Sequence, residues 1–238
     1  MKLGIMQPYL FPYIGYWQLL NAVDRYIIAD DVNFIKAGWI NRNNILLKGK
    51  PYKVIIPIKD ASSNRLICDT EILDDQYWRN KLLKTISSSY KKAPFYNDVF
   101  PIIDDIINQK EVKISRYLEY SIRRICEYLL IDTQIVMATS VDDGKVLPCA
   151  EKVIDICKMQ GADQYYNAIG GQELYSYEEF CKSGIEISFV KTNPIVYKQF
   201  KNVFVPDLSI IDVMMFNSVQ EMHELLSGFE LVLNRMQI

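Results

Sequence analysis

The sequence has one histidine, no paired cysteines and no long apolar run, and each absence excludes a class of protein. A zinc site of His and Cys, or a Ser/His or Cys/His catalytic pair, would depend on His223 alone, within the solvated helix pattern "SVQEMHELLSGFE". The five cysteines form no CxxC pair, and their odd number is a poor disulfide framework. Cys126, Cys157 and Cys181 fall in apolar helical patterns, which predicts buried free thiols in a reducing cytoplasm.

The sequence also lacks the signals of membrane and nucleic-acid proteins. No stretch approaches the roughly 20 apolar residues that span a bilayer. Gln7, Pro8 and Pro12 interrupt the apolar start, and no signal-peptide cleavage site follows before Asp24. The formal net charge is −2 and the pI about 5.6, so no overall positive field gathers phosphates. We therefore expect a cytoplasmic protein with no membrane span and no nucleic-acid partner.

Strand and helix patterns alternate along the chain. An apolar strand at 2–6, a helical pattern at 14–22 and a strand ending at Asp30 have the size of a right-handed βαβ unit with parallel strands. The alternation resumes later, with strands at 133–139, 163–169 and 185–191 and helices at 149–160, ended by Gly161, and at 171–184. The fold class is therefore α/β, a mostly parallel sheet with flanking helices.

The intervening segment has a different pattern. A strand at 52–58 precedes a polar turn and "LICDTEI", which pairs back as a small β excursion, and residues 76–130 read as helices. Its last helix carries an apolar stripe at spacings of four, four, three and four: Ile114, Leu118, Ile122, Ile125 and Leu129. We expect one α/β domain over residues 1–238, with a β/helical insertion at about 52–130 that adds a helical layer.

The loop after the first strand, within "IMQPYLFPYIGYWQLL", is loaded with large side chains. Its two prolines fix φ at their positions and limit the flexibility of the loop. Gln7 places a polar amide directly after a buried strand, where it needs partners, and a ligand can be one. This favours substrate binding by Gln7, Tyr9 and Tyr16. The alternative is a stiff loop whose tyrosines pack on neighbouring helices.

The segment "DDVNFIKAGWINRNN" follows the second strand and is dense in planar polar groups. Asp30 or Asp31 can act as a base or hold a cationic amine, and the forked donor of Arg42 suits a carboxylate or a phosphate. The alternative is an internal Asp–Arg pair that closes an irregular loop. The further binding candidates in this segment are Asn33, Trp39, Asn41 and Asn43.

Two more loops are expected at the same sheet edge, because ligands gather beyond the carboxyl ends of parallel strands. One is "SVDDGK", after the strand at 133–139. The other is "NAIGGQELY", where Gly170 and Gly171 precede a predicted helix and can present N–H groups to an anion, with Gln172 beside them. The alternative is a glycine N-cap. We predict one cleft shared by the aspartates, Arg42, Gln7 and this glycine turn.

A last segment, "YKQFKNVFVPDLSIID", places Tyr197 and Asp212 near the start of an apolar helix. Both are substrate-binding candidates. The structural alternative is that Ser209 caps the helix with Asp212 at N3, a variant of the capping box.

These segments resemble the WbqC-like family, bacterial proteins often encoded among genes for surface polysaccharides, and the similarity runs over essentially the whole chain. This chain differs from the pattern of the family at Asn44, where relatives usually carry arginine. The shared positions are Pro8, Tyr9, Pro12, Asp30, Asp31, Trp39, Asn41, Arg42, Asn43, Ser209, Asp212 and Asn217. The resemblance implies a transferase of surface polysaccharide (O-antigen or capsule) biosynthesis that transfers an acyl or aminoacyl group to an amino sugar. A fainter likeness to nucleotidyltransferase-like folds suggests a doubly wound topology.

Two hypotheses follow. In the first, Asp30 or Asp31 deprotonates or orients an attacking amine on a nucleotide-linked or carrier-linked sugar, Arg42 holds an anionic group, and an acyl donor or carrier protein is the partner. In the second, the chain is a non-catalytic binding protein for a sugar nucleotide or a biosynthetic partner. The sequence names no cofactor. It predicts no protein-only metal site, because adjacent residues on a strand point to opposite faces.

Overall fold

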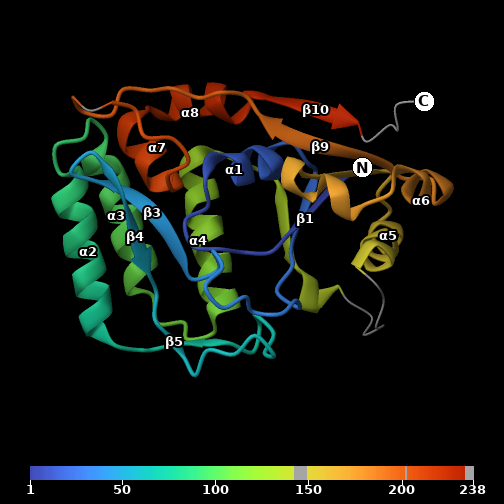
Figure 1. Cartoon of the computed structure of the whole chain (residues 1–238), viewed down its shortest axis with the longest axis horizontal. Helices are drawn as coiled ribbons and strands as arrows, with labels where there is room; N and C mark the ends of the chain where they lie inside the picture. The colour runs from blue at the N-terminus through green and yellow to red at the C-terminus, as the bar shows by residue number, and fades with distance from the viewer. Residues whose placement is uncertain (142–148, 202, 234–238) are drawn as a thin grey trace.

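A six-stranded sheet crosses the molecule in the computed structural model, which describes residues 1–141, 149–201 and 203–233 (Figure 1). The strand order is β10-β9-β8-β1-β2-β7. Five strands are parallel, and only β10 runs antiparallel, along β9. The strands are β1 (Lys2–Met6), β2 (Arg25–Ile28), β7 (Gln134–Met137), β8 (Gln164–Ala168), β9 (Glu186–Thr192) and β10 (Phe229–Leu233). The predicted α/β class with a mostly parallel sheet is confirmed, whereas β10 was not predicted.

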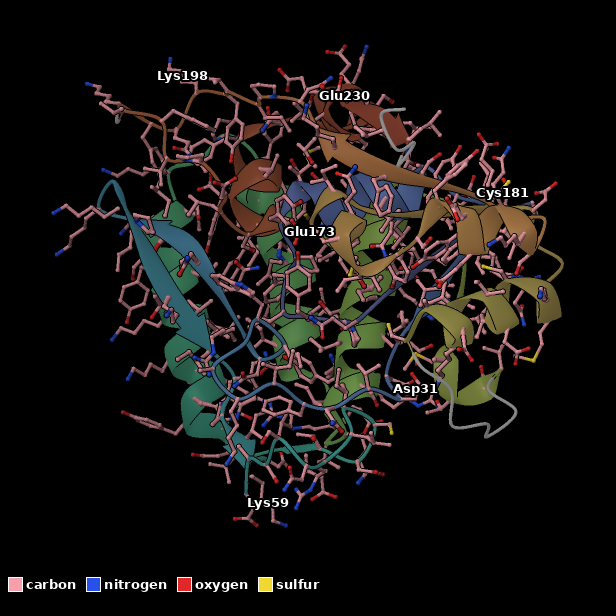
Figure 2. The ribbon with its side chains drawn as sticks, turned by 45° about the vertical axis from the view of Figure 1, so that its right-hand side comes forward. Asp31, Lys59, Glu173, Cys181, Lys198 and Glu230 are labelled. Atoms are coloured by element: carbon pink, nitrogen blue, oxygen red, sulfur yellow. The ribbon has the colours of Figure 1, made fainter. Side chains whose placement is uncertain are left out.

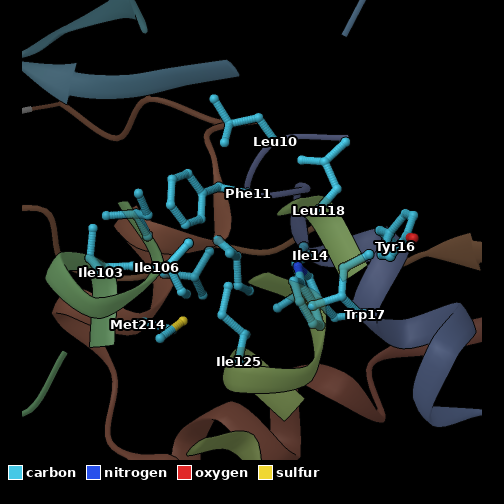
Figure 3. Packing of buried hydrophobic residues seen from close by; sticks show 14 of the residues in the cluster. Leu10, Phe11, Ile14, Tyr16, Trp17, Ile103, Ile106, Leu118, Ile125 and Met214 are labelled. Atoms are coloured by element: carbon cyan, nitrogen blue, oxygen red, sulfur yellow. The ribbon is translucent and has the colours of Figure 1, made fainter. Parts of the chain in front are cut away.

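Helices cover both faces of this sheet, so its inner strands are apolar on both sides. One core contains Tyr26 and Ile28 of β2 with helices α1 (Ile14–Asn21), α4 (Ile114–Leu129), α7 (Ile210–Phe216) and α8 (Val219–Leu226). The other contains Leu3 and Ile27 with α5 (Cys149–Met159) and α6 (Tyr177–Lys182). Figure 3 shows Phe11, from the loop after β1, beside Ile106 and Met214 in the first core.

The chain between β2 and β7 forms a separate layer. It contains the hairpin of β3 (Arg42–Leu47) and β4 (Lys50–Ile55), the short pair β5 (Ile58–Lys59) and β6 (Glu71–Ile72), and helices α2 (Gln76–Tyr90), α3 (Tyr96–Asn108) and α4. All five residues of the predicted α4 stripe are 0% exposed, which confirms it. The single-domain organisation with an insertion at about 52–130 stays a prediction.

Sequence reasoning treated the start of this hairpin as a loop, and this was wrong. Arg42 and Asn43 lie in β3, whose partner β4 begins two residues before the strand predicted at 52–58. Asparagines are depleted in strands, so "NRNNILL" gives a poor strand signal. Tertiary contacts override that preference, because Ile45 and Leu46 of β3 are buried against the helical layer.

The helix predicted at 171–184 is also wrong in part. A 3₁₀ segment, η2 (Ile169–Leu174), comes first, and α6 starts only at Tyr177. Tyr175 stands between them with an extended backbone, and its buried ring packs against Tyr165 and Phe180. Because α6 is so short and turns Phe180 inward, Cys181 is exposed, contrary to the prediction. Gly161, with φ at +68°, follows the end of α5 as predicted.

Candidate functional site

Three of the predicted loops leave the sheet at one edge, because β1, β2 and β8 are parallel. These loops carry Gln7, Asp31 and Gly171. The strand order reverses there, since β1 connects to β2 on one side while β8 adds on the other side. Ligands of open α/β sheets bind in the crevice at such a reversal. Most of the fourth loop, "SVDDGK", lies outside the described residues.

Asp30 and Asp31 turn to different partners. Asp30 is 1% exposed, and its carboxylate accepts hydrogen bonds from the amide N of Thr139 at 3.0 Å and from its Oγ1 at 2.9 Å. Asp31 lies 2.6 Å from Nζ of Lys152 on α5, and its side chain keeps 10% exposure. Among the described residues, neither aspartate forms the internal pair with Arg42 that was the alternative. Lys152 carried no sequence signal, because it lies on a distant helix.

The loop after β1 (residues 7–13, the first loop) is fastened along its backbone. Nδ2 of Asn43 donates to the carbonyls of Leu10 at 2.9 Å and Phe11 at 2.8 Å. The Pro12 carbonyl accepts from Nε1 of Trp17 at 3.0 Å and from the amide N of Ile210 at 2.9 Å. Phe11 has φ at +42°, a left-handed conformation that costs about 1–3 kcal/mol in a residue other than glycine. The hydrogen bonds of the loop backbone and the full burial of the Phe11 side chain stabilise this conformation.

Tyr9 of this loop belongs to an edge-to-face aromatic cluster with Tyr16 of α1 and Tyr26 of β2. Tyr16 is 3% exposed, and its ring meets Tyr9 at 5.2 Å and Tyr26 at 5.4 Å, both edge to face. Burial raises the pKa of all three hydroxyls. Tyr9 is partly exposed at the surface, whereas Tyr16 is buried and packs against it.

The segment after Asp31 divides into a buried and an exposed half. Asn41 and Asn43 are 5% and 4% exposed, and Nδ2 of Asn41 donates to the Ile56 carbonyl at 2.7 Å. Trp39 is 50% exposed and Asn33 is exposed too. Arg42 is half-buried, and its Nε is buried with no hydrogen-bond partner among the described residues. The outward-facing candidates are therefore Asn33, Trp39 and Arg42.

The glycine turn does not begin a helix. Gly170 and Gly171 lie inside η2, so they are not the N-terminus of α6, whose N-cap is Ser176. The prediction that these glycines directly precede the helix at 171–184 is therefore wrong, whereas their role in binding an anion stays a prediction. A side chain at Gly171 would stand 3.2 Å from the Asn167 amide, whereas Gly170 faces open space. The turn, with the half-buried Gln172 after it, stays at the edge that carries Asp31.

Asp212 lies in a different place, a buried group that we call the Asp212 cluster (Tyr90, Tyr197, Gln199 and Asp212). Its carboxylate is 0% exposed and accepts from Oη of Tyr90 at 2.8 Å, Oη of Tyr197 at 2.6 Å and Nε2 of Gln199 at 2.6 Å. Burial raises the pKa of Asp212, against the opposing effect of these donors. Sequence reasoning missed Tyr90, since only the fold brings α2 next to α7.

The predicted capping box at Asp212 does not form. Ser209 caps α7, because its Oγ accepts from the amide N of Ile211 at 3.2 Å, as predicted. The Asp212 side chain turns to the cluster instead. A complete capping box occurs in the next helix, where Ser218 and Glu221 bond reciprocally at the start of α8.

A cavity of about 430 Å³ adjoins the Asp212 cluster. It lies between the start of α1, α7 and the chain after β9, with Tyr13 and Tyr197 among its mostly apolar lining. Neither aspartate of the sheet edge lines it. Figure 1 shows α7 and α5, which carry Asp212 and Lys152, on opposite sides of the view. The candidate residues thus form two separate sites.

The described residues contain neither a cluster of metal ligands nor a membrane-spanning helix. No three His, Cys, Asp or Glu side chains are placed to hold a metal ion there. In the same residues, no helix is long and apolar enough to cross a membrane.

Comparisons with known proteins relate the chain to a family. The chain is similar to the uncharacterized protein Rv1507c of Mycobacterium tuberculosis, with 23% identity over 217 residues, covering 90% of this chain and 92% of the relative. No solved structure matches the chain significantly. The model of the WbqC-like protein family matches residues 7–224, from Gln7 of the first loop through Asp31 and Asp212. The match covers most of the chain, and the protein therefore belongs to the WbqC-like family.

Proposed function

We propose that the protein is a transferase of bacterial surface polysaccharide (O-antigen or capsule) biosynthesis that transfers an acyl or aminoacyl group to the amine of an amino sugar. The observation that carries the proposal is the Asp31–Lys152 pair, 2.6 Å apart and still partly open, at the sheet edge where the strand order reverses. The association of WbqC-like proteins with polysaccharide genes supports the pathway.

The sheet order supports a nucleotide-linked or carrier-linked sugar as the substrate. The five parallel strands, β1, β2, β7, β8 and β9, occur in the order β7-β2-β1-β8-β9, which is 3-2-1-4-5 in order of appearance. One common class of doubly wound sheet has this order at its centre and binds dinucleotides at the reversal, and we propose that the topology here is likewise doubly wound and nucleotidyltransferase-like. Gln7, Gly170, Gly171 and Gln172 border that reversal on its two sides.

In the proposed reaction the sugar amine attacks the carbonyl carbon of the acyl donor directly. The new N–C bond forms, the bond from the acyl carbon to the carrier breaks, and the amine proton passes to the Asp31 carboxylate. Lys152 orients that carboxylate. The two hydrogen bonds between Thr139 and Asp30 fix the backbone at Asp30 and thereby position the adjacent Asp31. Arg42 holds an anionic group of the ligand, and the exposed face of Trp39 stacks on a sugar ring.

The experiment compares Asp31→Asn, Arg42→Ala and Asp132→Asn in the host pathway and on purified protein. Asp132 is exposed and precedes β7, so it lies at the opposite edge and is the matched control. We expect Asp31→Asn to remove the modified sugar from the product while thermal shift by a nucleotide sugar persists, and Arg42→Ala to weaken that shift. An unchanged sugar product with both site variants would make the site assignment wrong.

A second candidate is a non-catalytic binding protein for a sugar nucleotide or a biosynthetic partner. The exposed Trp39 and Asn33 favour it, since stacking and hydrogen bonding recognise sugars without chemistry. Incubation of the bound nucleotide sugar with acyl donors separates the two. A ligand that is bound but never converted, whichever donor is supplied, would favour binding alone.

A further inference from the structure

One end of the molecule concentrates lysines without acidic neighbours. Residues 42–59, 76–97 and 193–206 contain no Asp or Glu. Ten exposed lysines lie in them. Lys59 pairs with Glu71, and within the described part of the chain the other nine form no ion pair: Lys48, Lys50, Lys53, Lys81, Lys84, Lys91, Lys92, Lys198 and Lys201. Because the whole chain has a net charge of −2, this positive charge is local and does not follow from composition.

The fold brings these three segments together. A groove of about 410 Å³ is lined by Lys48 from the β3–β4 turn, by Lys91 and Lys92 after α2, and by Phe200. Lysines just after a helix complement its dipole, which accounts for Lys91 and Lys92 in part. It does not account for Lys48, which comes from a hairpin turn. The positive charges of these lysines repel one another, so their convergence does not stabilise the fold. Such a cluster is typical of a surface that binds an anionic ligand.

A second groove, of about 340 Å³, continues the surface between β4 and α2. Lys53 and Lys81 line it together with apolar side chains that are open to solvent, Tyr52 at 42%, Ile55 at 46% and Tyr77 at 71% exposure. The face therefore combines ammonium groups with exposed aromatic and aliphatic groups.

Helix α2 presents this combination as a stripe. Tyr77, Lys81 and Lys84 are spaced four and three residues apart, so they share one helix face, and all three are exposed. The opposite face carries Leu82 and Ile86, which are buried in the core. The amphipathic pattern thus has a basic outer side with an aromatic residue at one end.

We infer that this surface, the basic face, docks the protein peripherally onto an anionic phospholipid membrane. Clusters of four to eight basic residues beside exposed aromatic side chains bind anionic headgroups. Lysine is depleted from the cores of protein interfaces, and nucleic-acid readout relies mainly on arginine, which is absent from the exposed set. The inference goes beyond the proposed transfer reaction and does not depend on it. Figure 2 shows Lys198 and Asp31 on opposite sides of the view.

The test is co-sedimentation of the full chain with vesicles of phosphatidylcholine, with and without phosphatidylglycerol. The triple variant Lys48→Glu, Lys91→Glu and Lys92→Glu is compared with Lys110→Glu, Lys158→Glu and Lys182→Glu, which changes the net charge equally at exposed sites elsewhere. Each lysine near an anionic surface is worth about fivefold in partitioning. Loss of three lysines should therefore weaken binding by about 100-fold, and repulsion by the three new carboxylates should weaken it further. The second should keep most of the binding.

Two further measurements keep the inference testable if the triple variant does not fold. Wild-type binding to the anionic vesicles should fall steeply as salt is added, because salt screens exposed charges. Tyr77→Ser should weaken binding a few-fold through lost apolar burial. Binding that is absent from anionic vesicles, equal on neutral ones, or equally lost in the control triple would overturn the inference. Binding to RNA or to an acidic protein without vesicle binding would also overturn it and assign the face to that partner. Nucleotide-sugar binding at the Asp31 edge should be unchanged in the triple variant, which separates this test from that of the transferase.

Discussion

Asp31 and Asp212 both lie within the residues that match the family model, yet their surroundings differ in kind. Asp31 follows the end of β2, pairs with Lys152 among the described residues, and keeps a tenth of its side chain exposed. Asp212 is fully buried, and neutral donors from Tyr90, Tyr197 and Gln199 satisfy it. A partly open ion pair can exchange its partner for a ligand, whereas a closed buried network opens only with loss of packing. We therefore propose that the sheet edge carries the chemistry and expect the cluster to contribute stability.

The two sites also differ in the number of secondary-structure elements that they connect. The amide N of Leu46 in β3 donates to Oη of Tyr90 at 2.7 Å, so the Asp212 cluster ties β3, α2, α7 and the segment after β9 together. The Asp31–Lys152 pair ties one loop to α5. The following predictions test this contrast.

The largest effect is expected when the cluster loses its carboxylate. Asp212→Ala leaves three buried donors unpaired and should lower the free energy of unfolding by about 3–5 kcal/mol. Asp31→Ala should cost about 1 kcal/mol, because its pair is near the surface. Urea denaturation of both variants measures the difference. Equal losses would remove the distinction between the two sites.

The pH dependence of stability provides a second test. Burial raises the pKa of Asp212, so the native protein binds a proton more readily than the unfolded chain. Its contribution is fully present below the unfolded pKa of about 3.9 and is lost as pH rises through the folded pKa. The stability of wild type relative to Asp212→Asn should therefore be greater at about pH 4 than at about pH 7.

Asp105 supplies the control of opposite sign. Hydrogen bonds from Tyr120 and Arg124 lower its pKa, so its contribution is present above the unfolded pKa and is lost as pH falls. The stability of wild type relative to Asp105→Asn should rise between the same two pH values. If both differences changed in the same direction, the assignment of the pH effect to Asp212 would fail.

The two halves of the segment after Asp31 form a smaller version of the same comparison. Asn43→Ala removes the two bonds that hold Leu10 and the left-handed Phe11, and should cost about 2 kcal/mol. Asn33→Ala, at an exposed position, should cost less than about 0.5 kcal/mol but weaken ligand binding at the sheet edge. Denaturation and thermal shift with a nucleotide sugar separate the effects, and the reverse pattern would exchange the two roles.

The smallest effect on function is expected at the only histidine of the sequence. Nε2 of His223 donates to the Leu129 carbonyl at 2.8 Å from an exposed position on α8. His223→Ala should cost about 0.5–1 kcal/mol and leave the sugar product of the pathway unchanged. A loss of product with the fold intact would place a catalytic group outside both sites.

Sequence patterns predicted the parts of this fold that depend on local periodicity. The stripe on α4 and the parallel strands follow from repeating apolar positions that the core must cover on one or both sides. The strand β3 and the 3₁₀ turn at Gly170 were misread. The buried Asn43 lies in β3, and the inward-facing Tyr175 ends the 3₁₀ turn. Single buried residues of this kind leave no periodic pattern in the sequence.

The sequence by itself determined the α/β class, the family and the loops that hold the candidate groups. Only the tertiary structure decided which aspartate faces which partner. Lys152, Thr139 and Tyr90 reach Asp31, Asp30 and Asp212 from elements far away in the chain. The physical reason is that burial and charge pairing depend on distances between elements, and these are set by packing in three dimensions and not by the spacing of residues along the chain.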